Sequence, residues 1–325
     1  MKLPPATPPS EAPPAGAAAT PSAGIQLKAI LAAADFSDES LAGVRYAVAL
    51  AGKSGSAVTL LHVVEPPSRL AGMEVVALAR TDEEVAALAR AELATLAERE
   101  TADGVHPTAC VRIGKPFHQI ATAAREQAAD LLVIASHGRS GWQRVLLGST
   151  AERVVRHTPC PVLTVPARAP LPPTSPAVPL RIKRILVPLD FSTVSEAALP
   201  WATFLAEHCQ AELVLLHVTE QFPLDYLMGR ELTDSTVAPL MKQATTNLQR
   251  IAGSLGKATG RNASVVVCTG SPFEEICGAA QTLGADLIVL TTHGYTGLKH
   301  VWLGSTAERV VRNACCPVLT VRASN

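Results

Sequence analysis

Two glycine-rich loops in this chain contain the residue types that could bind a phosphate group. One reads SHGRSG at 136–141 and continues to Gly-Ser-Thr at 148–150; the other reads THGYTG at 292–297 and continues to Gly-Ser-Thr at 304–306. Glycine lets backbone N–H groups approach an anion closely, and a helix beginning at each Gly-Ser-Thr would direct unpaired N–H groups at the same place. The alternative is a tight turn followed by an ordinary helix with Ser149 as its N-cap.

The composition of these loops limits the chemistry expected of them. The chain has no GxxxxGK[ST] segment, so it is not a P-loop NTPase. No lysine is placed to neutralise a γ-phosphate, although Arg139 could do so in the first loop. Fast ATP hydrolysis is therefore not expected.

Other polar residues with chemical potential recur at matching places. Asp35 and Asp190 each end an apolar run, where a carboxylate could hold a metal ion, bind a ribose hydroxyl or cap the next helix. Four histidines also follow apolar runs: His62, His137, His217 and His293. They lack the close ligand spacing typical of a metal site. We therefore expect these histidines to hydrogen-bond to loop backbone and predict no metal site.

The recurrence extends over most of the chain. Four segments return 155 or 156 residues later in the same order: Asp-Phe-Ser of 35–37, Leu-Leu-His-Val of 60–63, Gly-x-Pro-Phe of 114–117 and LGSTAERVVR of 147–156. Because chance does not produce four landmarks at near-constant offset, the sequence contains an internal duplication. Two repeats of this length indicate two domains rather than a solenoid.

Each copy alternates segments typical of strands and helices. The strands expected in the first copy are 28–34, 57–64, 107–112, 130–135 and 161–165, with helices at 38–52, 82–101, 117–128 and 149–157. The strands expected in the second copy are 183–189, 212–219, 264–268, 286–291 and 317–321. The strand cores are continuous apolar runs, as expected of parallel strands buried on both faces. This α/β pattern predicts two tandem doubly wound, five-stranded parallel sheets of Rossmann-like type.

Such sheets bind ligands beyond the carboxyl ends of their strands, which is where the aspartates, histidines and glycine loops fall.

Residues 1–24 are rich in Pro, Ala and Ser and are predicted to be a disordered tail. A second Pro-rich stretch, 167–180, is predicted to be a stiff linker. The predicted domains are therefore 25–166, called copy one below, and 181–325, called copy two. Ser37 is expected to cap the first helix.

Charge and composition restrict the partners. Lys plus Arg and Asp plus Glu both number 28, so there is no basic excess for nucleic acid, and no apolar run is long enough for a membrane span. The N-terminus lacks the apolar centre of a signal peptide, which predicts a cytoplasmic protein. The seven cysteines include no CxxC, so buried reduced thiols are expected, with Cys315-Cys316 packed at a strand start.

On these residues the chain resembles the universal stress protein family. That family carries an Asp after strand one, a His-Val end on strand two and the motif G-x-x-G-x9-G-[ST]. The second part of the motif is matched twice, but its first glycine is Ala135 in copy one and Thr291 in copy two. The nucleotide-binding residues that the resemblance and the adjoining loop positions imply are Asp35, Val63, Ala135, His137, Gly138, Arg139, Gly141, Gly148, Ser149 and Thr150 in copy one. The counterparts in copy two are Asp190, Val218, Thr291, His293, Gly294, Gly297, Gly304, Ser305 and Thr306.

The resemblance implies an ATP-binding stress-response sensor or regulator, with or without Mg²⁺, that acts on an unidentified protein partner. Two alternatives stay open: a nucleotide-free protein-interaction scaffold, and a slow ATPase or autophosphorylating protein with Ser149 or Ser305 as acceptor. Copy one is expected to bind ATP more tightly, because Thr291 is bulkier than Ala135. Family members commonly pair through the last strand, so the copies are expected to form an internal pseudo-dimer, alone or within a homodimer.

Overall fold

The computed structural model describes residues 24–66, 81–102, 104–137, 147–167, 169, 182–220, 234–292 and 304–322. Copy one contains β1 Ala29–Ala33, α1 Asp38–Ser54, β2 Ala57–Val64, α2 Asp82–Arg99, β3 Thr108–Ile113, α3 Pro116–Glu126, β4 Leu131–Ala135, α4 Ser149–His157 and β5 Val162–Val165. Copy two contains β6 Arg184–Pro188, α5 Thr193–Glu196, α6 Ala198–Cys209, β7 Glu212–Thr219, α8 Asp234–Thr259, β8 Ala263–Thr269, α9 Pro272–Leu283, β9 Leu287–Thr291, α10 Ser305–Asn313 and β10 Val318–Val321. The predicted strands are all present, within about two residues at each end.

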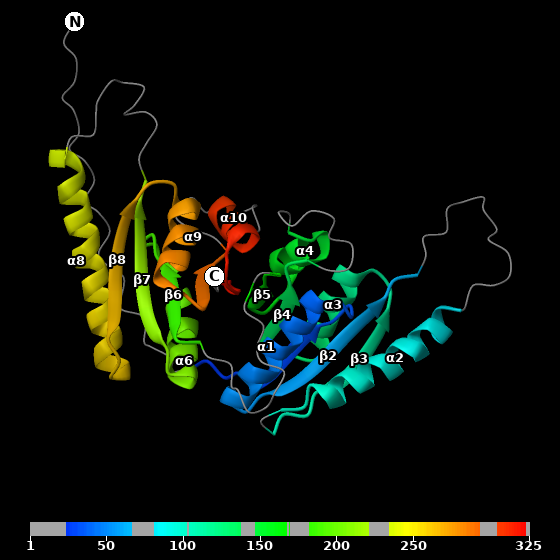
Figure 1. The fold of residues 1–325 in the computed structure, drawn as a ribbon. Helices are drawn as coiled ribbons and strands as arrows, with labels where there is room; N and C mark the ends of the chain where they lie inside the picture. The colour runs from blue at the N-terminus through cyan, green and yellow to red at the C-terminus, as the bar shows by residue number, and fades with distance from the viewer. Residues whose placement is uncertain are drawn as a thin grey trace, which may run out of the picture.

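A single ten-stranded sheet runs through both copies in the order β3-β2-β1-β4-β5-β10-β9-β6-β7-β8 (Figure 1). The strands within each copy are parallel, as predicted, and each copy forms one half of the sheet. The halves meet where β5 and β10 pair antiparallel, with Leu163 opposite Leu319. The predicted pairing of the last strands is therefore present, and neither of these two strands is left as an open edge.

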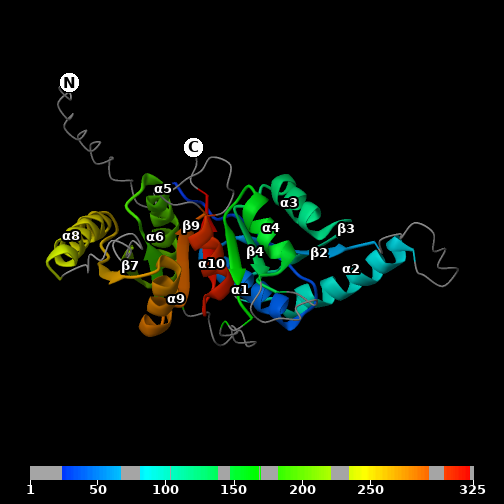
Figure 2. The same cartoon turned by 90° about the horizontal axis from the view of Figure 1, so that it is seen from above.

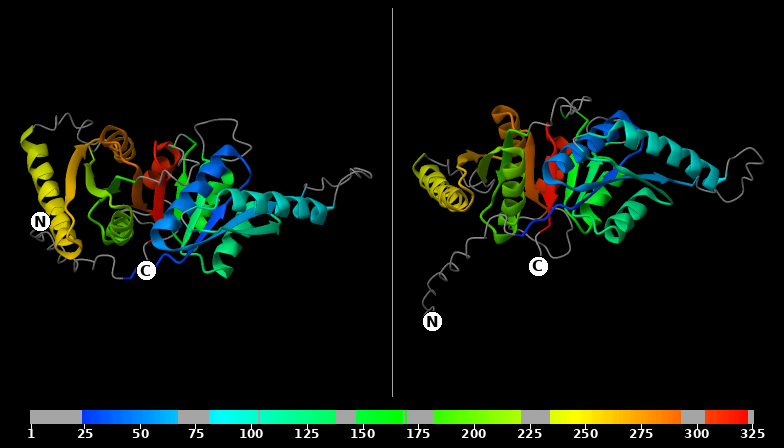
Figure 3. Two further views of the ribbon diagram at one scale, coloured as in Figure 1. Left: turned by 60° about the horizontal axis from the view of Figure 1, so that its bottom comes forward. Right: turned by 90° about the horizontal axis from the view of Figure 1, so that it is seen from below.

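Contacts beyond the strand ladder also join the halves. The Arg156 guanidinium of α4 lies 3.0 Å from the Glu308 carboxylate of α10, and the Thr320 hydroxyl donates to the Val162 carbonyl at 3.1 Å. Arg322 donates to the backbone carbonyl of Arg156. Figure 2 shows α4 and α10 side by side near the centre of the sheet, with α2 and α8 at its two ends. Figure 3 shows the same central junction from two further directions.

Helices cover both faces of the sheet, and successive strand residues enter different apolar clusters. In β4, Leu131 and Val133 belong to a cluster with α1 and α2, whereas Leu132 and Ile134 belong to a cluster with α3 and α4. This alternation explains why the strand is apolar at every position. Among the described helices, none combines the length and hydropathy needed to cross a bilayer.

The segments predicted to flank the domains lie almost entirely outside the described residues. Only Gly24 of the tail is described, so the tail stays a prediction. Within the predicted linker, Ala169 is buried in the core and its N–H donates to Pro166 O at 2.9 Å. The start of the segment expected to be a linker therefore packs against the domain.

The cysteines depart in part from the expectation of buried thiols. All seven are free thiols; Cys160 and Cys316 are buried, four are half-buried, and Cys315 is exposed. Cys316 packs ahead of β10 as expected. Cys315 precedes it in the turn after α10, where its side chain meets solvent.

The first helix shows how sequence differences between the copies alter local structure. In copy one it is continuous, and the Ser37 side chain accepts from the Ser40 N–H, as predicted for an N-cap. In copy two the equivalent helix is divided into α5 and α6 at Ala197. Pro200 explains the break, because it has no N–H to donate to the carbonyl four residues earlier, at Glu196.

The ends of these helices yield a stability prediction. Gly55 follows α1 at φ 72°, and Gln210 follows α6 at φ 56°, so both adopt the left-handed conformation that favours glycine. Gln210→Gly is expected to raise the free energy of unfolding by about 0.5–1 kcal/mol. Gly55→Gln is expected to lower it by a similar amount. Urea unfolding measures both variants, and a destabilising Gln210→Gly would contradict the argument.

A buried tyrosine predicts loss of stability at alkaline pH. Tyr46 is only 4% exposed, and burial, followed by nearby Cys316 and Asp286, raises its pKa from 10.0 to about 12. The folded state holds the Tyr46 proton more tightly than the unfolded state does. The resulting stabilisation of the fold is complete below pH 10 and is lost as the pH rises towards 12. The loss is about 2–3 kcal/mol. Urea unfolding at several pH values should show a shallower alkaline decline in Tyr46→Phe than in wild type; equal slopes would refute this.

Candidate functional site

A cavity of about 280 Å³ lies at the carboxyl ends of the central strands of copy one. This is close to the lower limit of small-molecule sites, roughly 300–1,000 Å³. Its lining includes seven of the predicted residues: Asp35, Val63, Ala135, His137, Gly148, Ser149 and Thr150. Segments that are distant in the sequence therefore meet at one place, as the switch-point argument predicts.

The Asp35 carboxylate is part of the turn that begins α1. Its Oδ1 accepts from both the N–H and the hydroxyl of Ser37, at 3.1 and 2.5 Å. The Asp35 N–H in turn donates to Ser40 Oγ at 3.2 Å. Asp35 thus holds the capping serine in place instead of capping the helix directly. The same bonds fix where the carboxylate meets the cavity.

The residue between Asp35 and Ser37 has an unusual backbone conformation. Phe36 adopts φ 63°, which is uncommon for a residue with a side chain and disfavoured for a bulky one. Its ring packs on the imidazole of His62 with centroids 4.5 Å apart. Copy two repeats the arrangement, with Phe191 at φ 62° against His217 at 4.3 Å. Backbone strain kept in both copies is typical of a site whose geometry is held by its surroundings.

The strand-two histidines bind backbone, as the sequence predicts. His62 Nδ1 donates to the Ala34 carbonyl at 2.8 Å, and His217 Nδ1 donates to that of Leu189 at 2.8 Å. His137 differs, because its Nδ1 bonds to the Ser136 hydroxyl at 2.8 Å instead of to backbone. Across the ranges that the structure describes, no group of three or more His, Cys, Asp or Glu could hold a metal ion.

The start of α4 forms the polar wall of the cavity. The N-cap is Gly148, not Ser149 as predicted, and no side chain of the described residues caps this helix. The first N–H groups of a helix have no partner within it, and here they begin at the cavity lining. A Cβ added at Gly148 would lie 3.2 Å from the Ser136 carbonyl oxygen, so only glycine permits this close approach without a shift.

The imidazole of His137 supplies a second polar feature of the cavity. Its Nε2 is buried and has no hydrogen-bond partner among the residues that the structure describes. A buried polar atom without a hydrogen-bond partner lowers the free energy of unfolding and is rare in folded proteins, so its presence indicates a structural or functional cause. A ligand with polar atoms in this cavity would provide the missing partner.

Copy two places its predicted residues on equivalent elements. Asp190 Oδ1 accepts from the Ser192 N–H at 3.0 Å and from its hydroxyl at 2.5 Å, as in copy one. Val218 lies in β7, Thr291 ends β9, and Gly304 is the N-cap of α10, which begins at Ser305 and Thr306. Thr291 occupies the position of Ala135, and its side chain is buried. The two sites therefore share backbone geometry and differ in the space beside the strand-four end.

Several predicted residues lie outside the described residues: Gly138, Arg139, Gly141, His293, Gly294 and Gly297. The cavity lining also includes residues that were not predicted as site residues, among them Ser40, Glu65, Pro116 and Ile120. Pro116 belongs to the repeated Gly-x-Pro-Phe segment, which served only as a landmark of the duplication. Its repetition in both copies was the signal that could have identified it.

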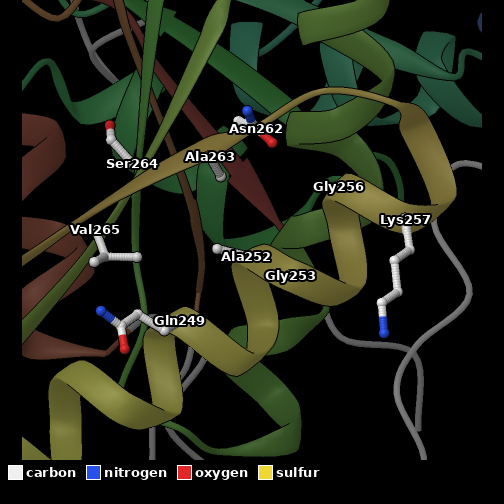
Figure 4. A pocket seen from close by; sticks show the side chains of 9 residues that line it. All are labelled: Gln249, Ala252, Gly253, Gly256, Lys257, Asn262, Ala263, Ser264 and Val265. Carbon is white, nitrogen blue, oxygen red and sulfur yellow. The ribbon is translucent and has the colours of Figure 1, made fainter.

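A second hollow lies far from these residues, between α8 and the edge strand β8 (Figure 4). It measures about 590 Å³ and is lined by small and amide side chains, with Lys257 as the only charged group among its described lining residues. It contains none of the repeated motif residues. By size alone this groove would be the better candidate ligand site. The recurring polar groups and the start of α4 instead favour the smaller cavity in copy one as the ligand site.

Comparison with known proteins agrees with the fold and the duplication. The family model described as "Universal stress protein family" matches residues 26–166 and 181–322. A universal stress protein of Mycolicibacterium smegmatis is 27% identical over 301 residues, 90% of this chain and 96% of that protein. One from Methanocaldococcus jannaschii is 34% identical over 140 residues, 43% of this chain and 82% of that protein.

A solved structure shows the same architecture over nearly the whole length. The crystal structure of a universal stress protein from Archaeoglobus fulgidus covers 92% of this chain and 98% of its own, with a TM-score of 0.65 and 22% identity. At that identity the likeness establishes the fold alone. The family match over both copies shows that this chain belongs to the universal stress protein family, with two family domains in tandem.

Proposed function

We propose that the copy-one cavity binds ATP and that the bound state regulates a protein partner in the stress response. The observation that carries the proposal is the convergence of Asp35, His137 and the start of α4 on one cavity. The Asp35 carboxylate suits a ribose hydroxyl, and the first N–H groups of α4 suit phosphate oxygens.

The geometry at Gly148 supports a phosphate in this position. Because Gly148 has no Cβ, its backbone lies close to that of Ser136, with the Gly148 N–H donating to Ser136 O at 2.8 Å, and this leaves the start of α4 open to an anion. The apolar side chains of Val63 and Ile120 provide a surface for a base or sugar. These cavity residues would therefore bind ATP and orient it.

Copy two is proposed to bind ATP more weakly. Its turn at Asp190 and its helix start at Gly304 repeat those of copy one. Thr291, however, adds a branched, buried side chain where copy one has the methyl group of Ala135. If Thr291 costs copy two a single ligand contact of about 1.4 kcal/mol, the ATP affinity of copy two is ten-fold lower than that of copy one.

Mass spectrometry of small molecules released from the denatured full-length protein tests this function. ATP in stoichiometric amounts up to one per chain supports it. Protein that carries no nucleotide and shows no heat of binding when titrated with ATP favours a nucleotide-free scaffold. Turnover of added ATP, or phosphate transferred to Ser149 or Ser305, would favour the slow enzymatic alternative.

A further inference from the structure

Copy two carries three cysteines on or beside two neighbouring helices: Cys277 on α9, and Cys315 and Cys316 just after α10. Only Cys316 has a cysteine counterpart in copy one, at Cys160. In copy one, Ala121 stands at the position equivalent to Cys277, and Pro159 at the position equivalent to Cys315. Copy two therefore differs from copy one by a pair of thiols added on neighbouring elements.

The fold brings this pair together. Helices α9 and α10 each connect two parallel strands of one sheet, so they run in the same direction. The Arg309 guanidinium of α10 lies 3.5 Å from the ring centroid of Phe273 in the first turn of α9. Cys277 lies one helical turn after Phe273 on α9, and Cys315 lies six residues after Arg309, two residues past the end of α10.

The surroundings of the thiols agree with this placement. Cys277 packs against the apolar cluster that contains the buried Cys316, and Cys315 directly precedes Cys316 in the chain. Burial, together with the neighbouring Cys315, raises the pKa of the Cys277 thiol to about 11. Cys277 is half-buried and Cys315 is exposed to solvent.

We infer that Cys277 and Cys315 form a peroxide-sensitive dithiol that closes to a disulfide between α9 and the turn before β10. Exposure favours Cys315 as the first thiol to react, and the half-buried Cys277 as the thiol that resolves it. Cys316 is the poorer partner for Cys315, because adjacent Cα atoms are about 3.8 Å apart, below the usual disulfide range of about 4.4–6.8 Å.

The chemistry balances with hydrogen peroxide as the oxidant. The Cys315 thiolate attacks one peroxide oxygen; an S–O bond forms, the O–O bond breaks, and the departing hydroxide takes up a proton as water. The Cys277 thiol then loses its proton as its sulfur attacks the Cys315 sulfenic sulfur; the S–S bond forms, the S–O bond breaks, and the departing hydroxide takes up a proton and leaves as a second water. Two thiols are oxidised and one peroxide is reduced.

Peptide mapping of the full-length protein after hydrogen peroxide treatment tests the inference. Trypsin places Cys277 in a peptide with Cys268, and Cys315 in a peptide with Cys316, so fragmentation of the cross-linked pair must locate each sulfur. We expect a Cys277–Cys315 bond that dithiothreitol reverses. It should disappear in Cys277→Ala, the copy-one residue, and in Cys315→Ser, and persist in Cys316→Ala.

Any of three results would overturn the inference. These are a Cys315–Cys316 bond, a bond to Cys268, or oxidation of Cys315 to sulfinic acid with no cross-link. If Cys316→Ala does not fold, the map of the wild-type chain still decides, because each pairing gives a distinct fragment pattern. None of these readouts depends on nucleotide binding.

Discussion

Replacing Gly148 with valine is expected to weaken ATP binding at least about ten-fold. A Cβ at this position lies 3.2 Å from the Ser136 carbonyl oxygen and 3.8 Å from His137 Cα, and valine adds two methyl groups beyond it. The backbone must move apart, which displaces the first N–H groups of α4 from the proposed phosphate position. Loss of charge-assisted hydrogen bonds worth about 1.5–3 kcal/mol corresponds to this change in affinity.

Gly304→Val is the matched variant, because Gly304 is the N-cap of α10 at the same position in copy two. Titration of both variants and the wild type with ATP by calorimetry measures the two sites separately. Most of the tight binding should disappear in Gly148→Val and remain in Gly304→Val. The reverse result would assign the stronger site to copy two.

Leu319→Asp is expected to destabilise the protein by about 4 kcal/mol or more. Leu319 is 1% exposed and lies opposite Leu163 at the antiparallel junction of β5 and β10. An aspartate there must be buried as an unpaired charge or taken up as a neutral acid, and both are costly. Because both halves of the sheet meet at this pair, the loss should affect unfolding of the whole chain.

Leu240→Asp is the control, because Leu240 lies on α8 and is 48% exposed. Its free energy of unfolding should stay within about 0.5 kcal/mol of wild type. Urea unfolding followed by circular dichroism measures both variants. A Leu319→Asp protein as stable as this control would show that the junction contributes little to the fold.

The sequence predicted the architecture well because buried parallel strands leave a strong pattern. Every residue of β4 is apolar and buried, and the duplication supplied each strand assignment twice. The division of the first helix in copy two was not predicted, since it depends on one missing N–H at Pro200. Nor was the exposure of Cys315, because its side-chain environment is set by how the turn leaves α10.

Part of the lining of the copy-one cavity was predicted from the sequence, but its geometry was not. Strand-end residues such as Asp35 and Gly148 follow from topology, because parallel strands bring their carboxyl ends to one edge. The left-handed backbone of Phe36 has no sequence signal, since phenylalanine rarely adopts it. N-cap propensity also did not predict Gly148, because the neighbouring Ser149 is the more common residue type at an N-cap. Glycine occupies this N-cap because the Ser136 carbonyl oxygen lies too close to leave room for a Cβ without a shift.

Hydrogen exchange with and without ATP, read by mass spectrometry on the full chain, tests the proposed site most directly. Binding in the copy-one cavity predicts slower exchange in the peptides that contain Asp35, Val63 and the first turn of α4. Binding in the groove between α8 and β8 would instead slow exchange across residues 249–265. Protection confined to that groove, or no protection at saturating ATP, would contradict the account.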